Sequence, residues 1–134
     1  MRLENNWRFK SLANLNRLSK FTISANPPSH IISRCEELHL VALADFTVED
    51  IRLMIGQGYS FNYLVPLALE KLKEDILAEG DFFPGDLLSN VLNIKPSFWK
   101  ENPDLFDQLK TLVLANEELI VNEGISIKMF RVTM

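Results

Sequence analysis

The stretch FTVEDIRLMIGQG, residues 46–58, carries the strongest structural signal in the chain. Thr47 is followed three residues later by Asp50, the spacing of a capping box, in which each side chain accepts a hydrogen bond from the other residue's backbone N–H. Phe46 precedes the cap and Ile51 is the fourth residue after it, so these two can close a hydrophobic staple. The segment therefore predicts an amphipathic helix that begins directly after Thr47.

The same kinds of signal predict further helices on both sides of this segment. Apolar residues recur at intervals of three and four, which places them on one face of a helix. The expected helix N-caps are Ser11, Thr47, either Ser60 or Asn62, and Asn102. About six short helices are expected on this basis. They lie at about residues 11–19, 29–41, 47–56, 60–75, 87–92 and 103–119.

Proline and glycine indicate where these helices begin and end. Residues 102–104, Asn-Pro-Asp, combine a capping residue, a proline at the first helical position and an acid that complements the helix dipole. Pro66 falls within the first turns of its helix, so that helix either begins near Val65 or bends there. Either Gly56 or Gly58 can supply the left-handed turn that ends the central helix.

Two turns carry pairs of aromatic residues. Residues 78–86, AEGDFFPGD, form a compact turn that contains Phe82 and Phe83, and a second turn after Pro96 holds residues 98–99, Phe-Trp. A stacking platform for nucleic acid would need basic residues among such aromatics. We therefore expect both turns to plug the hydrophobic core.

The pattern changes after Gly124. Residues 125–132 alternate between apolar and polar side chains, which is the period of a β-strand. For residues 120–134 an isolated strand, a docked extended arm and a mobile tail all fit the sequence. The expected architecture is an all-α, single-domain irregular bundle over residues 1–134, with an extended or strand-like C-terminal tail as one alternative.

Composition indicates an ordinary globular protein. Hydrophobic residues make up 47% of the 134 residues and charged residues 24%, which argues against disorder. The single cysteine, Cys35, cannot form an intrachain disulfide, which fits a reducing compartment. No apolar region typical of a signal peptide and no run of roughly 18 apolar residues is present. We therefore expect a soluble cytoplasmic protein.

The net charge of −4 is unevenly distributed. Residues 1–34 have a balance of +5, residues 35–90 have a balance of −8, and residues 91–134 have a balance of −1. An acidic middle disfavours binding to nucleic acid or to an anionic membrane and favours a basic partner. A solvated surface that keeps the protein soluble explains the same charge, so charge alone does not identify a function.

Residues that could carry chemistry are few. Cys35 and His39 share a helical face, but a nucleophilic dyad also needs an oxyanion hole and an orienting group, and a cysteine on an apolar stripe usually packs as a small hydrophobe. Glu79, Asp81 and Asp86 lie near glycines without the ligand spacing of a calcium loop, so hydrogen bonds to turn backbone explain them better. No histidine or cysteine spacing indicates zinc. We expect neither an enzyme nor a cofactor or metal site.

Three segments together resemble a known family. They are KSLANL at residues 10–15, FTVEDIRLMIGQ at residues 46–57, and AEGDFFPGDLL at residues 78–88. The Phe-Trp pair at 98–99 before Asn-Pro at 102–103 agrees in position. The chain resembles immunity proteins of bacterial contact-dependent growth inhibition (CDI) systems.

The resemblance covers roughly residues 10–118 and implies a function. Members of that family are small cytosolic proteins that bind and block the toxic C-terminal domain, often a nuclease, delivered by a neighbouring cell. The matching residues are mostly those of caps and turns, so the shared motif indicates scaffold, and no toxin-contacting residue carries over. The resemblance therefore implies a protein that neutralises its cognate toxin without chemistry.

A nuclease holds a polyanion in a basic cleft, so an acidic helical surface would be steered onto that cleft and exclude the substrate. We expect a monomer that forms a 1:1 complex through acids on outer faces and central loops, with two tyrosines as anchors. The candidate toxin-binding residues are Asp45, Glu49, Tyr59, Tyr63, Glu70, Glu74, Asp75, Glu79 and Asp81. The alternatives are a helical adaptor or structural subunit for a basic partner and, less favoured, a small hydrolase.

Overall fold

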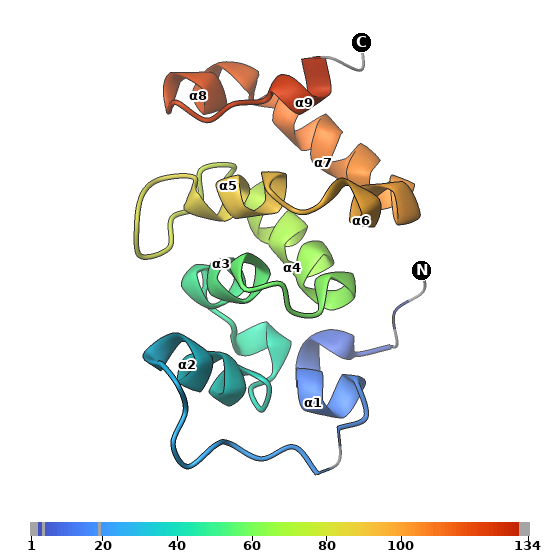
Figure 1. Cartoon of the computed structure of the whole chain (residues 1–134). Helices are drawn as coiled ribbons and strands as arrows, with labels where there is room; N and C mark the ends of the chain where they lie inside the picture. The colour runs from blue at the N-terminus through green and yellow to red at the C-terminus, as the bar shows by residue number, and fades with distance from the viewer. Residues whose placement is uncertain (1–2, 4, 19, 132–134) are drawn as a thin grey trace.

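The computed structural model describes residue 3 and residues 5–18 and 20–131, and this part of the chain consists of helices joined by turns and loops (Figure 1). Within it, one isolated antiparallel bridge between Ser11 and Ala42 is the sole β pairing. The predicted all-α irregular bundle is therefore confirmed. Val132, the last residue of the predicted strand-like segment, lies outside the described residues.

The described residues form nine α-helices and two short 3-10 helices, more than the six predicted, because several expected helices are shorter or divided. They are η1 (Trp7–Phe9), α1 (Leu12–Leu15), α2 (His30–Leu38), η2 (Leu43–Asp45), α3 (Val48–Gly56), α4 (Phe61–Glu74), α5 (Asp86–Leu92), α6 (Pro96–Glu101), α7 (Pro103–Ala115), α8 (Glu117–Asn122) and α9 (Lys128–Arg131).

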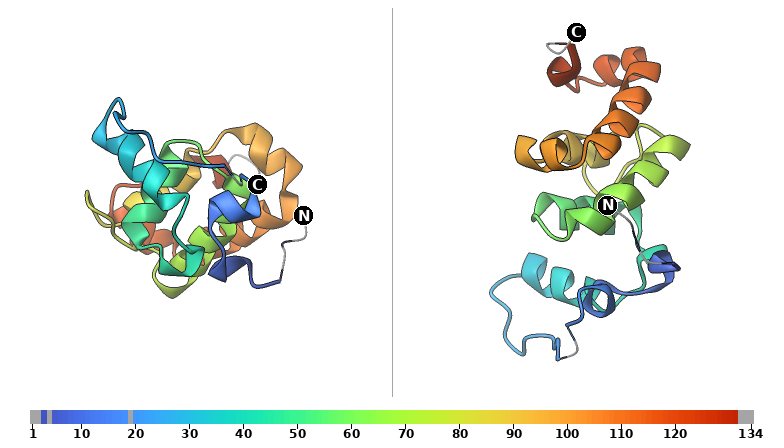
Figure 2. Two further views of the ribbon diagram at one scale, coloured as in Figure 1. Left: turned by 90° about the horizontal axis from the view of Figure 1, so that it is seen from below. Right: turned by 90° about the vertical axis from the view of Figure 1, so that its right-hand side faces the viewer.

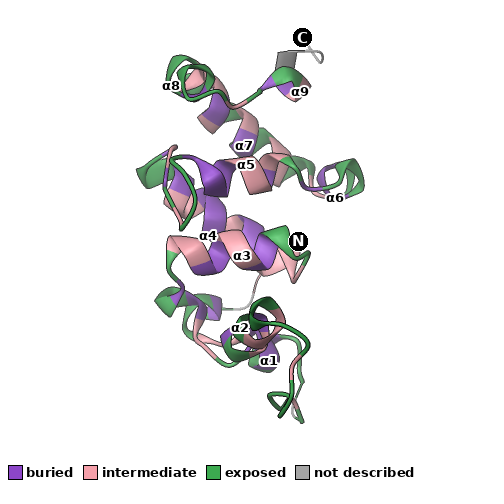
Figure 3. Ribbon diagram, turned by 60° about the vertical axis from the view of Figure 1, so that its left-hand side comes forward, coloured by how far each residue is buried: buried purple, intermediate pink, exposed green. Residues whose placement is uncertain are grey.

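The helices are stacked along one direction. Figures 1 and 2 show α1 and α2 at one end, α3, α4 and α5 in the middle, and α8 and α9 at the other end. Helix α4 contributes six buried residues, and Figure 3 shows buried surface of α4 and α5 inside the stack. No helix in the described part of the chain is long and apolar enough to span a bilayer.

The start of α3 confirms the predicted capping box. The backbone N–H of Asp50 donates to Thr47 Oγ1 (3.1 Å), and that of Thr47 donates to Asp50 Oδ2 (3.0 Å). Phe46 and Ile51, the predicted staple residues, are both buried. Gly58 has a φ of +84°, so this glycine supplies the left-handed turn after the helix.

Polar side chains fix the neighbours of α3. From α2, Arg34 donates to the other oxygen of Asp50 (3.1 Å), so the capping carboxylate also joins two helices. From α5, the side-chain amide of Asn90 donates to the backbone oxygen of Arg52 (2.9 Å). A buried polar group without a partner is costly, so these two contacts favour one orientation of α2 and α5 against α3.

Two predicted caps occupy the right positions but bond differently. Ser60 precedes α4 with a φ of +40°, and its hydroxyl accepts from Asn16 instead of capping the helix. The side chain of Asn102 donates back to the carbonyl of Phe98 (2.9 Å) and does not cap α7. Helix α4 begins at Phe61 and continues through Pro66, so of the two alternatives for this proline the start near Val65 is excluded.

Three predicted helix boundaries are also wrong. The first helix ends at Leu15 rather than Ser19, because the chain turns through a left-handed conformation at Arg17 (φ +57°). The helix expected to reach Leu119 divides at Asn116, the residue between α7 and α8. Pro96 opens the helix α6 where a turn was predicted, as a proline at the first helical position can.

A chain of aromatic rings explains why the C-terminal segment is helical. The rings of Phe61, Phe98, Trp99, Phe106 and Phe130 follow one another at centroid distances of 5.2–5.9 Å. Phe130 is fully buried, so tertiary packing overrides the strand-like alternation and closes the last turn as α9. For the described part of the tail, residues 120–131, the strand alternative is therefore wrong.

Candidate partner-binding surface

A buried carboxylate organises the loop between α4 and α5, defined here as residues 79–85. Asp86 is 2% exposed and accepts hydrogen bonds from the backbone N–H groups of Gly80 (2.7 Å), Phe82 (3.0 Å) and, more weakly, Phe83 (3.4 Å). The sequence predicted that an acid here would satisfy turn backbone, and Asp86 does so. Asp86 is the first residue of α5, and the residue before it, Gly85 (φ +85°), is the N-cap.

A second carboxylate ties the loop to α3. Glu49 accepts from the backbone N–H of Asp81 (2.8 Å) and from Arg52 Nε (2.6 Å), and Arg52 Nε lies 4.0 Å from Asp86. The hydrogen bond from Arg52 lowers the pKa of Glu49, and the same contact raises the pKa of the guanidinium. Two carboxylates and one guanidinium therefore hold the loop in place.

Gly80 is required by this arrangement. A Cβ atom at residue 80 would lie 2.5 Å from Glu49 Oε1, closer than real contacts allow, and a tight 3.3 Å from Arg52 Cδ. At the other end of the loop, a Cβ at Gly85 would meet the side chain of Ile125 at 2.5 Å. The glycines thus permit both anchoring groups and the C-terminal segment to approach the loop backbone.

The loop presents two aromatic residues to solvent, which overturns the prediction that they plug the core. Phe82 is 69% exposed and Phe83 is 46% exposed. The guanidinium of Arg52 lies 4.5 Å from the ring centroid of Phe82, a cation–π contact that supports one face of the ring. The prediction is confirmed for Phe98 and Trp99, which are buried.

The nine predicted toxin-binding residues do not form one cluster. Five of the acids are exposed: Asp45, Glu74, Asp75, Glu79 and Asp81. Of these, Glu79 and Asp81 lie in the loop, whereas Asp45 lies on η2, and Glu74 and Asp75 lie where α4 ends. The loop brings Asp81 beside the predicted Glu49, the one pair among the nine joined by a hydrogen bond between different elements in the described part of the chain.

Three of the other predicted residues contact side chains of the protein itself. Glu70 forms a bidentate ion pair with Arg8 that joins α4 to η1. Tyr59 packs edge-on against His39 (5.3 Å between centroids), and Tyr63 lies 6.4 Å from the ring of Trp7. Both tyrosines are half-buried against the core, so less of each ring is free to contact a partner than the sequence predicted.

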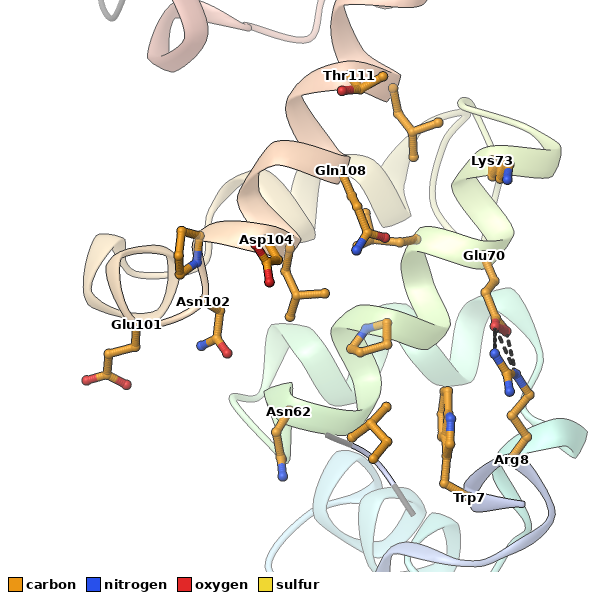
Figure 4. A pocket seen from close by; sticks show the side chains of 16 residues that line it. Trp7, Arg8, Asn62, Glu70, Lys73, Glu101, Asn102, Asp104, Gln108 and Thr111 are labelled. Carbon is orange, nitrogen blue, oxygen red and sulfur yellow. Dashed lines mark hydrogen bonds and ion pairs between the residues drawn. The ribbon is translucent and has the colours of Figure 1, made fainter. Parts of the chain in front are cut away.

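A groove of about 670 Å³ lies between η1, α4 and the start of α7 (Figure 4). Its walls mix apolar side chains such as Trp7 and Leu105 with charges of both signs. Figure 4 shows the Arg8–Glu70 pair on one side and Glu101 and Asp104 on another. Because its charges are mixed, the groove has no clear electrostatic preference.

Cys35 and His39 pack as structural residues. Cys35 is 1% exposed, and burial raises the pKa of its thiol. The ring Nδ1 of His39 lies 2.8 Å from the backbone oxygen of Cys35, and the ring stacks on Phe21. Among the described residues, no group of three or more His, Cys, Asp or Glu side chains is placed to hold a metal ion.

Comparison with known families decides the affiliation. The family model described as CDI immunity proteins matches residues 17–109, more than half of the chain. The chain belongs to the family of CDI immunity proteins. The match contains α2 to α6 of this CDI immunity protein, including the loop of residues 79–85 (the aromatic loop), and it ends within α7. Neither the curated proteins nor the solved structures yield a match.

Proposed function

We propose that this CDI immunity protein binds the toxin domain of its own system and neutralises it by non-covalent occlusion. The observation that carries the proposal is the family match over residues 17–109. The toxin is a nuclease with a basic active cleft, and the immunity protein acts in the cytoplasm as a monomer in a 1:1 complex. No bond is made or broken by the inhibitor.

The distribution of charge supports a basic partner. The eleven acids of residues 35–90 exceed the bases there by eight, and five of the predicted contact acids are exposed. Such a surface accelerates encounter with a basic cleft and repels the polyanionic substrate that would compete for it. We propose that these exposed acids contact the toxin directly.

The four remaining candidates have different proposed roles. Glu49 holds the loop against α3, and Glu70 holds η1 against α4, so both position the surface. Tyr59 and Tyr63 are half-buried, and their exposed edges serve as aromatic anchors at the margin of the contact.

Co-expression with the toxin domain encoded by the adjacent CDI gene tests the proposal. Cells that express the toxin with this protein should grow, and the two proteins should co-purify as a 1:1 complex. Cys35→Ala and His39→Ala variants should protect as well as the wild type. Cell death without a complex would exclude the immunity function for that toxin, and a harmless binding partner would favour an adaptor.

A nuclease assay on the purified complex then tests occlusion. Toxin alone should degrade nucleic acid, and stoichiometric immunity protein should abolish degradation, with activity recovered after denaturation and removal of the inhibitor. If the toxin domain cleaves no nucleic acid, the nuclease part of the proposal is wrong while the immunity part stands.

A further inference from the structure

The exposed aromatic pair Phe82-Phe83 lies on a loop that is unusually well fixed for a surface segment. Asp86 binds three of its backbone N–H groups, Glu49 binds a fourth, and Arg52 supports the ring of Phe82. An exposed single apolar residue is ordinary, but adjacent phenylalanines held out by buried polar groups are not explained by packing.

We infer that Phe82 and Phe83 are the apolar anchor of the toxin-binding surface and insert into an apolar depression on the toxin that is rimmed by basic residues. This inference rests on the proposed function. Rigid aromatic residues dominate binding energy at interfaces because they bury a large area at a small cost in conformational entropy.

Local charge identifies the chemistry of the partner. Residues 79–86 contain Glu79, Asp81 and Asp86 and no basic residue. The charge of Arg52 is balanced by its bidentate contact with Glu49, so the rim of the aromatic pair is anionic. A partner that presents basic residues around an apolar depression matches this pattern, whereas an acidic protein surface or an anionic membrane would be repelled.

Preorganisation of the loop lowers the cost of binding. The backbone of residues 80–83 is already bonded to carboxylates that are themselves 2% exposed or half-buried. Association then immobilises few further torsions, and a larger part of the gain from burying two phenylalanine rings appears as affinity.

A double variant with a matched control tests the inference. Phe82→Ala/Phe83→Ala removes the anchor, and Phe9→Ala removes a phenylalanine that is 72% exposed on η1, away from the loop (Figure 1). Titration calorimetry with the purified toxin domain should show a dissociation constant raised by about thirtyfold or more for the double variant. The Phe9→Ala variant should bind as the wild type does.

Two further measurements keep the result interpretable. Circular dichroism and urea unfolding establish that the double variant is folded. Hydrogen exchange on the wild-type protein should show slower exchange of the backbone amides of residues 80–83 in the complex, a measurement that requires no substitution.

Each outcome bears on the inference. Wild-type affinity in the double variant, with no exchange protection of the loop, would overturn the inference and leave the proposed function intact. A wild-type protein that does not bind the toxin would overturn both. A wild-type dimer that the double variant converts to a monomer, with toxin affinity unchanged, would assign the pair to self-association and overturn the inference.

Discussion

The carboxylate of Asp86 lies 2.7 Å from the backbone nitrogen of Gly80 and closes the base of the loop that displays Phe82 and Phe83. The contact joins the first residue of α5 to the chain six residues earlier. Asp86 is buried and also accepts from the N–H groups of Phe82 and Phe83, so the shape of the exposed aromatic surface depends on this carboxylate together with Glu49.

Replacement of this carboxylate should destabilise the protein strongly. Asp86→Ala leaves part-buried N–H groups unpaired and removes a partner of Arg52, so we expect a loss of about 3 kcal/mol in the free energy of unfolding. Asp81→Ala, in the same loop but exposed, should cost less than about 0.5 kcal/mol. Urea unfolding measures both, and equal losses would contradict the anchoring role.

Loss of the α3 cap should have a smaller effect. Thr47→Ala removes the acceptor for the N–H of Asp50 and should cost about 1 kcal/mol. Thr111→Ala is the matched control, because the hydroxyl of Thr111 bonds back to the carbonyl of Asp107 within an exposed helix. Alanine is the better helix former there, so this variant should be as stable as the wild type or slightly more so in thermal unfolding.

Glu49 should contribute to the acid sensitivity of the protein. Its folded-state pKa is lowered, chiefly by the hydrogen bond from Arg52, so its contribution to stability is present above its unfolded pKa of 4.5 and is lost as the pH falls through the folded value. Glu49→Gln should therefore show a shallower fall in unfolding free energy below pH 4.5. Glu79→Gln makes the same change of side chain at an exposed position and is the matched control in the urea titrations.

Cys35 should be unreactive in the folded state. It is buried and its thiol pKa is raised by burial, so little thiolate is available at neutral pH. Labelling by a thiol reagent should be slow in buffer and should become fast at urea concentrations that unfold the chain. Fast labelling of the folded protein, with urea-independent kinetics, would show that the site opens locally.

Reversal of acids near the aromatic loop should slow association with the toxin. Glu79→Lys/Asp81→Lys should lower the association rate by about tenfold at low salt, with less effect at high salt. Asp107→Lys/Glu118→Lys changes the net charge equally at exposed positions on α7 and α8 and serves as the control. Equal slowing in both variants, measured by stopped flow, would mean that net charge alone steers the encounter.

Local signals in the sequence predicted the parts of the fold that local interactions decide. The capping box of Thr47 and Asp50, the cap at Ser11 and the proline at the start of α7 all occur as expected. The helical form of the C-terminal segment was not predictable, because it depends on the burial of Phe130 against Phe106, a contact made by packing between elements.

The candidate surface was predictable in part. The sequence predicted the acids and the hydrogen bonds of Asp86 to the turn backbone, but it did not predict the direction in which the loop side chains point. Phe82 and Phe83 looked like core residues because they are aromatic and adjacent. Their exposure follows from Glu49 and Asp86 binding the loop from beneath, and a long-range contact of this kind has no local signature.

The burial of both tryptophans gives the molecule two optical reporters. Trp7 lies on η1 against Tyr63, and Trp99 lies on α6 within the chain of aromatic rings. Fluorescence of each indole shifts when water reaches it, so single-tryptophan variants report separately on two parts of the stack. Coincident transitions would indicate one cooperative unit, and separate transitions would reveal which part of the stack melts first.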